Sequence, residues 1–166
     1  MEIKKRYGFN PATNPKKRKK TIKLLERKIE LMKENDKSTL SQKELEAYRE
    51  DLDKWEQLTR IDKSEDSLLF FVYEYLSDLK NPLNMAGNLI PDNQTINDSP
   101  EFHRELCSML DNVSVEGVGK VAWGAPRGHA KSAYLSNAFP LHQIVFNKRK
   151  FILVLSETDA ISRSFV

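Results

Sequence analysis

The sequence has few of the residues that mark disulfide-rich, zinc-binding or membrane proteins. Its 166 residues include one cysteine, Cys107, which has no partner within the chain. The three histidines, at 103, 129 and 142, lack the spacing of a zinc site. No apolar run approaches the roughly 20 residues that cross a bilayer, and the first residues contain no apolar stretch of signal-peptide length. These absences favour a protein of a reducing cytoplasm, with Cys107 as a buried structural thiol.

Positive charge is concentrated at the front of the chain. Residues 1–33 contain 12 Lys and Arg against 3 Glu, whereas the whole chain has a net charge of only +3. The run PKKRKK at 15–20 holds five of these cations. Such a run suits nucleic-acid phosphates or an acidic face of a partner protein, and a solvated arm without a partner fits the pattern equally well.

Two amphipathic helices are predicted in this basic region and just after it. The first runs from Thr21 to about Asn35, and the second follows a capping box formed by either Thr39 with Gln42 or Ser41 with Glu44. Their apolar stripes recur at helical spacing and consist of Ile22, Leu25, Ile29 and Met32, then Leu45, Tyr48, Leu52 and Trp55. We therefore expect an antiparallel hairpin within residues 1–62, either a stabilising appendage or a docking platform.

Further helices are predicted on both sides of a long loop. Residues 64–79 favour a buried helix capped by Ser64, with Leu68, Phe71, Tyr75 and Leu79 on one face. Residues 80–98 contain two prolines, a glycine and several Asn and Asp, which is typical of a loop. The sequence Ser99-Pro100-Glu101 then predicts the start of the next helix, with a cap, a first-turn proline and an acid.

The segment with the most chemical information is VGKVAWGAPRGHAKS, residues 118–132. Val118 to Trp123 is predicted to be a buried parallel strand, followed by a small-residue loop and a helix from Lys131 to about Ala138. This order aims backbone amides and a helix N-terminus at one point, where a triphosphate would bind. Lys131 would reach the β and γ phosphates and Ser132 would hold magnesium. A strand-turn-helix connection with a chance Lys-Ser pair is the alternative.

Two alanines distinguish this loop from the usual phosphate-binding pattern. Ala125 and Ala130 occupy positions where glycine is usual. Because alanine does not easily take a positive φ, we expect Ala130 to stay in an ordinary backbone region, with Gly128 supplying the permissive turn. Arg127 would lie on the rim of the phosphate site.

These motifs resemble the ATPase region of phage large terminase subunits. The resemblance covers roughly residues 99–166 and is carried by PRGHAKS, by Phe139-Pro140 and by FILVLSET, a predicted second strand ending in Ser156, Glu157 and Thr158. It implies ATP and Mg²⁺ as cofactors and catalytic roles for Arg127 and Lys131. In the family a short upstream helix contacts the adenine, here with Phe102 and His103. The implied nucleotide-binding residues are Phe102, His103, Pro126, Arg127, Gly128, His129, Ala130, Lys131 and Ser132, with Ser132 on the metal.

The resemblance also implies a function and a fold. Large terminases are ATP-driven motors that package double-stranded viral DNA into procapsids, with a small terminase subunit and a portal protein as partners. The motor would be a homo-oligomer at the procapsid portal, in the cytoplasm of the bacterial host. The implied fold is α/β: a helical N-terminal region, then the first strand, P-loop, helix and strand of a three-layer P-loop NTPase domain.

Length limits what the chain is expected to do. Residues 63–166 would be the N-terminal part of the ATPase domain, because no acidic Walker B strand or cluster of nuclease carboxylates follows. We therefore expect an N-terminal fragment that does not hydrolyse ATP by itself. The alternatives are another P-loop nucleic-acid-dependent ATPase, such as a helicase, and a noncatalytic binding protein with a degenerate P-loop.

Overall fold

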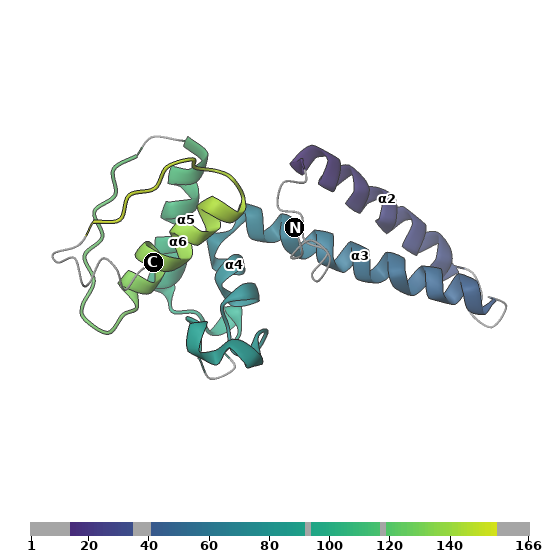
Figure 1. The fold of residues 1–166 in the computed structure, drawn as a ribbon, viewed down its shortest axis with the longest axis horizontal. Helices are drawn as coiled ribbons and strands as arrows, with labels where there is room; N and C mark the ends of the chain where they lie inside the picture. The colour runs from purple at the N-terminus through teal and green to yellow at the C-terminus, as the bar shows by residue number, and fades with distance from the viewer. Residues whose placement is uncertain (1–13, 35–40, 92–93, 117–118, 156–166) are drawn as a thin grey trace. The chain divides into compact units, whose positions relative to one another are not determined.

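The protein divides into two compact units, residues 1–63 and residues 64–166. The computed structural model describes residues 14–34, 41–91, 94–116 and 119–155 (Figure 1). Most of these residues are helical, and none of the described helices is long and apolar enough to cross a membrane.

The first unit begins with helix α2, Pro15–Glu34. Asn14 precedes the helix, and its side-chain oxygen accepts a hydrogen bond of 3.0 Å from the amide of Lys16. Pro15 at the first helical position costs no backbone bond there. The predicted helix at 21–35 is therefore confirmed, but it begins earlier. As a consequence, the run PKKRKK is helical.

Helix α3, Gln42–Asp66, is the second helix of this unit. Its start has the capping box of Ser41 with Glu44: the Ser41 amide donates to Glu44 Oε2 at 2.9 Å, and the Glu44 amide donates to Ser41 Oγ at 3.4 Å. The alternative cap, Thr39, lies outside the described residues. Helix α3 continues through Ser64, so the prediction of Ser64 as the cap of a separate helix is wrong.

Within the first unit, α2 and α3 pack as the predicted antiparallel hairpin. Their contacts pair early residues of one helix with late residues of the other (Figure 1). The pairs are Arg18 with Asp62, Glu26 with Trp55, and Lys28 with Asp51. The buried stripe on α2 consists of Ile22, Leu25 and Ile29, as the periodicity predicts.

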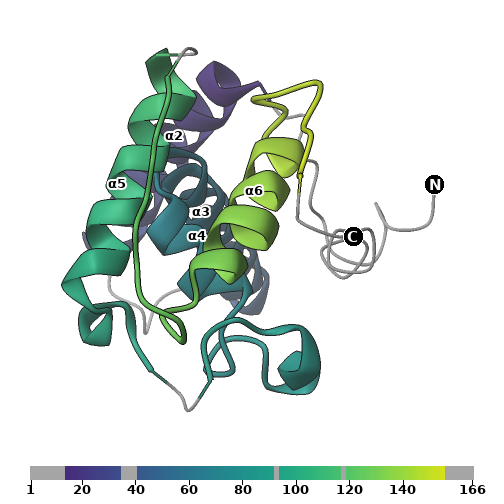
Figure 2. The same cartoon turned by 90° about the vertical axis from the view of Figure 1, so that its left-hand side faces the viewer.

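The second unit contains shorter helices. They are α4 Leu68–Tyr75, the 3₁₀ turns η2 Pro82–Gly87 and η3 Ile96–Asp98, α5 Glu101–Glu116, the π-helical η4 Ala133–Ala138, and α6 Phe139–Val145. Helix α4 packs against both α5 and α6, which lie on either side of it in Figure 2. Leu68 and Val72 of α4 are fully buried, and so is Leu106 of α5.

Several sequence predictions hold in this unit and others do not. Cys107 is 1% exposed on α5, and burial raises its pKa to about 12, so the prediction of an inert structural thiol is confirmed. Helix α5 begins where expected, yet the Ser99 hydroxyl has no hydrogen bond among the described residues and does not cap it. Leu79 lies beyond the end of α4 and is 45% exposed.

Buried side chains bind the last carbonyls of α3. His142 of α6 is fully buried, and its Nε2 donates to the Ser64 carbonyl at 2.8 Å. The ammonium of Lys148 donates to the Glu65 carbonyl. Both bonds go to carbonyls of the last helical turn, where a helix needs donors from outside its own ladder.

The start of α4 is bound in the same way. Ser67 Oγ accepts a bond of 3.2 Å from the Phe70 amide, and the carboxylate of Asp111 accepts from the Leu68 amide at 3.0 and 3.1 Å. Ser67 is thus the helix cap that the sequence analysis assigned to Ser64. Where the chain turns from α3 into α4, side chains therefore form hydrogen bonds with backbone groups at the two helix ends.

The predicted α/β architecture is wrong for the described residues. Neither 119–123 nor 151–155 forms a strand, and the one isolated bridge among the described residues joins Ser77 to Ile90. A strand must bond its amides and carbonyls to a neighbouring strand, and neither segment has one in the described part of the chain. Their apolar side chains are exposed instead: Val121 is 39%, Phe151 80% and Leu155 81% exposed. An apolar run favours burial of its side chains, but it does not determine whether a neighbouring strand is present to pair with it.

Candidate nucleotide-binding loop

The loop from Gly124 to Ser132 connects an irregular segment to a helical stretch that begins at Lys131. Gly128 has φ +83°, as predicted, with open space where a side chain would start. Ala130 has φ +53°, so the prediction of an ordinary conformation there is wrong. The first helical bond, from the Tyr134 amide to the Ala130 carbonyl, requires the chain to turn into the helix at Ala130. Alanine in this region costs about 1 kcal/mol.

The side chain of Lys131 turns back onto the loop. Its ammonium donates to the Ala125 carbonyl at 2.7 Å and to the Pro126 carbonyl at 3.3 Å. These bonds hold a cation inside the curve of the loop, in a helical segment whose N-terminus is itself positive. Ser132, the next residue, is exposed.

A cavity of about 470 Å³ lies against this loop. Its walls are Pro126, Arg127, Gly128, His129, Ala130, Lys131, Ser132 and Ala133. Apart from the turn at Arg127 and Gly128, the amides from Arg127 to Ser132 make no backbone hydrogen bond with the described residues. Unbonded amides beside a lysine are the arrangement that binds phosphate oxygens.

Two residues of α5 contact the loop. Phe102 lies with its ring 5.3 Å from that of His129, and His103 Nε2 is 3.1 Å from the His129 carbonyl. The His103 ring also stacks on Tyr134, with centroids 4.5 Å apart. The structure therefore brings together residues that lie far apart in the sequence and that were assigned to one site.

A second cavity, of about 260 Å³, adjoins the first. It is lined by Phe102, Trp123, Gly124, Ala125, Pro126 and His129, so the two cavities share Pro126 and His129. Trp123 Nε1 is buried and has no hydrogen-bond partner among the described residues. Sequence analysis missed Trp123 as a site residue, because it was assigned to a buried strand. The signal was an aromatic residue directly before the first glycine of the loop.

The described residues contain no cluster of three or more His, Cys, Asp or Glu suited to a metal ion. The predicted motif Ser156, Glu157 and Thr158 lies outside the described residues.

No protein-family model, curated protein or solved structure matches the chain. The resemblance to phage large terminases is thus carried by the sequence motifs alone.

Proposed function

We propose that the loop at residues 124–132 binds ATP with Mg²⁺, and that the chain serves in an ATP-driven motor that packages double-stranded DNA, as phage large terminases do. The observation that supports this most is the pair of joined cavities. One is lined by a loop with a lysine and unbonded amides, and the other by aromatic side chains. A nucleotide has the matching parts: a polyanionic chain and a flat base that stacks on aromatic rings.

Each residue of the loop has a distinct role in this proposal. Lys131 exchanges the carbonyls of Ala125 and Pro126 for the β and γ phosphates, where a cation is worth more than between neutral oxygens. Ser132 holds the metal. In the second cavity Phe102 packs against the base, and Trp123 Nε1–H is an unused donor at the same place.

Arg127, which is exposed beside the cavity, is proposed to stabilise the charge that develops as the γ-phosphoryl group leaves. In the assembled ATPase, Arg127→Ala should lower turnover by about 10²-fold or more while ATP affinity changes little. Steady-state kinetics separate the two effects. Unchanged turnover with a raised KM would assign Arg127 to substrate binding instead.

The binding proposal is tested by calorimetry with ATP and Mg²⁺ on the full chain. Wild type should bind, Lys131→Ala should not, and Lys150→Ala should bind like wild type, because Lys150 is an exposed lysine of the same unit outside the loop. The circular dichroism of all three proteins is compared first. Equal binding by wild type and Lys131→Ala would mean that the loop is not the nucleotide site.

A noncatalytic binding protein with a degenerate loop is the second candidate. It is favoured by the two bonds that hold Lys131 on its own loop and by the lack of a strand before the loop among the described residues. In that case wild type would bind neither ATP nor ADP, and activity would belong to the hairpin of α2 and α3. Partners such as a small terminase subunit or portal protein would then be recognised without hydrolysis.

A further inference from the structure

Helix α2 has four exposed cations on one face. Lys16, Lys20, Lys23 and Arg27 are spaced by four, three and four residues, which places them in one line along the helix. At 1.5 Å per residue the line is about 16 Å long. We call these four residues the basic stripe.

Three other cations of α2 pair with carboxylates of α3, whereas Lys17 is exposed. Arg18 is 2% exposed and its Nε lies 2.9 Å from Asp62 Oδ1. Lys19 Nζ lies 4.0 Å from the same carboxylate, and Lys28 pairs with Asp51. The run PKKRKK is therefore not one uniform patch. Arg18 and Lys19 contact α3, whereas Lys16 and Lys20 are the first two residues of the stripe.

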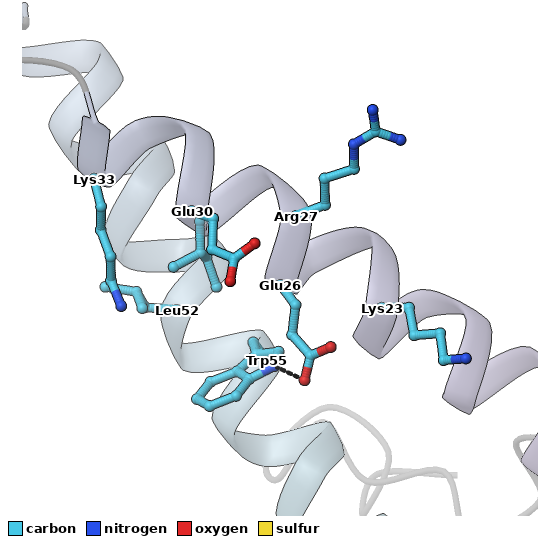
Figure 3. Close-up of a pocket in the computed structure, with 8 residues that line it drawn as sticks. Lys23, Glu26, Arg27, Glu30, Lys33, Leu52 and Trp55 are labelled. Carbon is cyan, nitrogen blue, oxygen red and sulfur yellow. Dashed lines mark hydrogen bonds between the residues drawn. The ribbon is translucent and has the colours of Figure 1, made fainter.

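Two acidic residues of α2, Glu26 and Glu30, line a groove of about 760 Å³ together with Trp55 and Leu52, and Lys23 and Arg27 of the stripe lie at the same groove. Glu26 points at Trp55 and accepts a bond of 3.3 Å from its Nε1, whereas Arg27 points away from α3 (Figure 3). Glu30 lines the same groove one turn later. The stripe thus ends at Arg27, and no acid lies between its members on that face.

The stripe also lies where cations are unfavourable for the helix. The first turn of α2 contains no acidic residue and begins with Lys16, Lys17 and Arg18, next to the positive end of the helix dipole. A cation there costs about 0.3–1 kcal/mol, and the four-residue line repels itself further. A sequence that departs from the local rule in this way is typical of a binding surface.

We propose that the basic stripe binds the phosphate backbone of double-stranded DNA without regard to sequence. A polyanion of evenly spaced charges matches a straight line of cations, and Lys and Arg on phosphates position a protein without reading bases. An anionic membrane fits less well, because Ile22, Leu25 and Ile29 of α2 are buried, which leaves only Leu24 and Leu31 as large exposed apolar side chains among the described residues of this helix. The choice of DNA among polyanions rests on the proposed packaging function.

The test is a titration of a duplex of about 20 base pairs, which is longer than the stripe, with the full chain at several salt concentrations. One variant replaces the stripe, and a matched variant removes the same charge from other exposed positions of the same unit. They are Lys16→Gln, Lys20→Gln, Lys23→Gln and Arg27→Gln against Lys33→Gln, Lys43→Gln, Arg49→Gln and Lys54→Gln.

The stripe variant should lose about 3 to 4 from the slope of log affinity against log salt, since each phosphate contact contributes about 0.9. Its affinity at about 50 mM salt should fall at least tenfold, and the matched variant should keep the wild-type slope. Equal losses in both variants would mean that only net charge matters and would overturn the proposal. So would tighter binding to vesicles with anionic lipid than to the duplex.

Two further measurements keep the result interpretable. On the wild type, duplex DNA should protect Lys16, Lys20 and Lys23 from acetylation while Lys43 and Lys54 stay reactive, and uniform protection would contradict the proposal without any variant. ATP binding separates the stripe from the loop. The stripe variant should bind ATP like wild type and Lys131→Ala should bind DNA like wild type, so failure of one proposal is distinguishable from failure of the other.

Discussion

The second unit contains two places where the chain turns from one element into a helix, and they differ in how the freed backbone groups are satisfied. At the junction around Ser67, carbonyls and amides are bound by the buried His142 of α6 and by the half-buried Asp111 of α5. At the loop before Lys131, apart from the turn at Arg127 and Gly128, the amides make no backbone hydrogen bond within the described part of the chain and face a cavity. The junction is internally complete, whereas the loop has bonding capacity left over.

The two places are expected to affect different properties of the protein, the junction its stability and the loop its binding of ligands. A satisfied buried polar group fixes one conformation, and removing its partner leaves an unpaired group in a region without water. An unsatisfied group beside a cavity adds nothing to folding, but a ligand can use it without breaking an existing bond. Within this unit we therefore expect changes at the junction to act on unfolding and changes at the loop to act on ligand binding.

The sharpest test of the comparison replaces one histidine at each place. His142→Ala should reduce the free energy of unfolding by about 3 kcal/mol, because it removes a buried hydrogen bond to the Ser64 carbonyl and opens a cavity beside Phe71 and Phe146, whose rings lie 5.2 and 5.1 Å away. His129→Ala, at an exposed loop position, should change it by less than about 0.5 kcal/mol. Urea unfolding measures both. Similar losses at the two sites would remove the distinction.

The pH dependence of stability gives a second test of the junction. Burial and nearby Lys148 lower the pKa of His142 to about 4 from 6.5, so the unfolded chain takes up that proton first and stability falls as the pH drops through this range. Burial raises the pKa of Asp111 to about 6 from 3.8, so the folded protein keeps a proton that the unfolded chain loses, and stability falls as the pH rises. Between about pH 4 and 6 the two effects oppose each other.

Removing either titrating group should reveal how the other changes the stability with pH. Relative to wild type, Asp111→Asn should lose stability as the pH falls from about 6 to about 4, by up to about 1.4 kcal/mol per pH unit. His142→Gln should change in the opposite direction. Urea unfolding at about pH 4, 5 and 6 measures both, and the shared carboxylates cancel in the difference from wild type. Two variants with the wild-type profile would show that these groups do not titrate as their surroundings indicate.

The smallest expected effects concern the loop backbone. Ala130→Gly should stabilise the protein by about 0.5–1 kcal/mol, because glycine accepts the positive φ that alanine resists. Gly128→Ala should destabilise it by about 1 kcal/mol through backbone conformation alone, since nothing lies within 4 Å of the added methyl group. Thermal unfolding shows whether each variant is more or less stable than the wild type. Destabilisation by Ala130→Gly would mean that the positive φ does not control stability at this position.

Local patterns in the sequence predicted the helices well. The stripe on α2, the cap at Ser41 and the start of α5 follow from spacing and side-chain chemistry within a few residues, and the structure has all three. The helix break at Ser67 was missed because Ser64 also fits a cap. What decides between them is Asp111, 43 residues away, which binds the first amide of α4.

Features that depend on contacts between distant segments could not be predicted from local patterns. Two apolar runs were assigned as strands, but a strand depends on a neighbour that its own residues do not specify. The loop residues of the candidate site were identified from a motif, and the contact of Phe102 with His129 came from a resemblance rather than from spacing. The burial of His142 depends on packing, and no local pattern marks it.

The buried contact of Arg18 with Asp62 has a consequence for the alignment of the hairpin. Two antiparallel helices with repeating apolar stripes can slide by one turn and still bury similar area, because the stripe repeats every three or four residues. A slid hairpin would separate the Arg18 guanidinium, which is 2% exposed in the observed alignment, from the Asp62 carboxylate. Replacing both by leucine should keep the hairpin stable but broaden the distances between spin labels at Lys16 and Lys63. The ion pair thereby fixes the register of the hairpin: it selects one alignment of the two helices among several that burial of the apolar residues alone would allow.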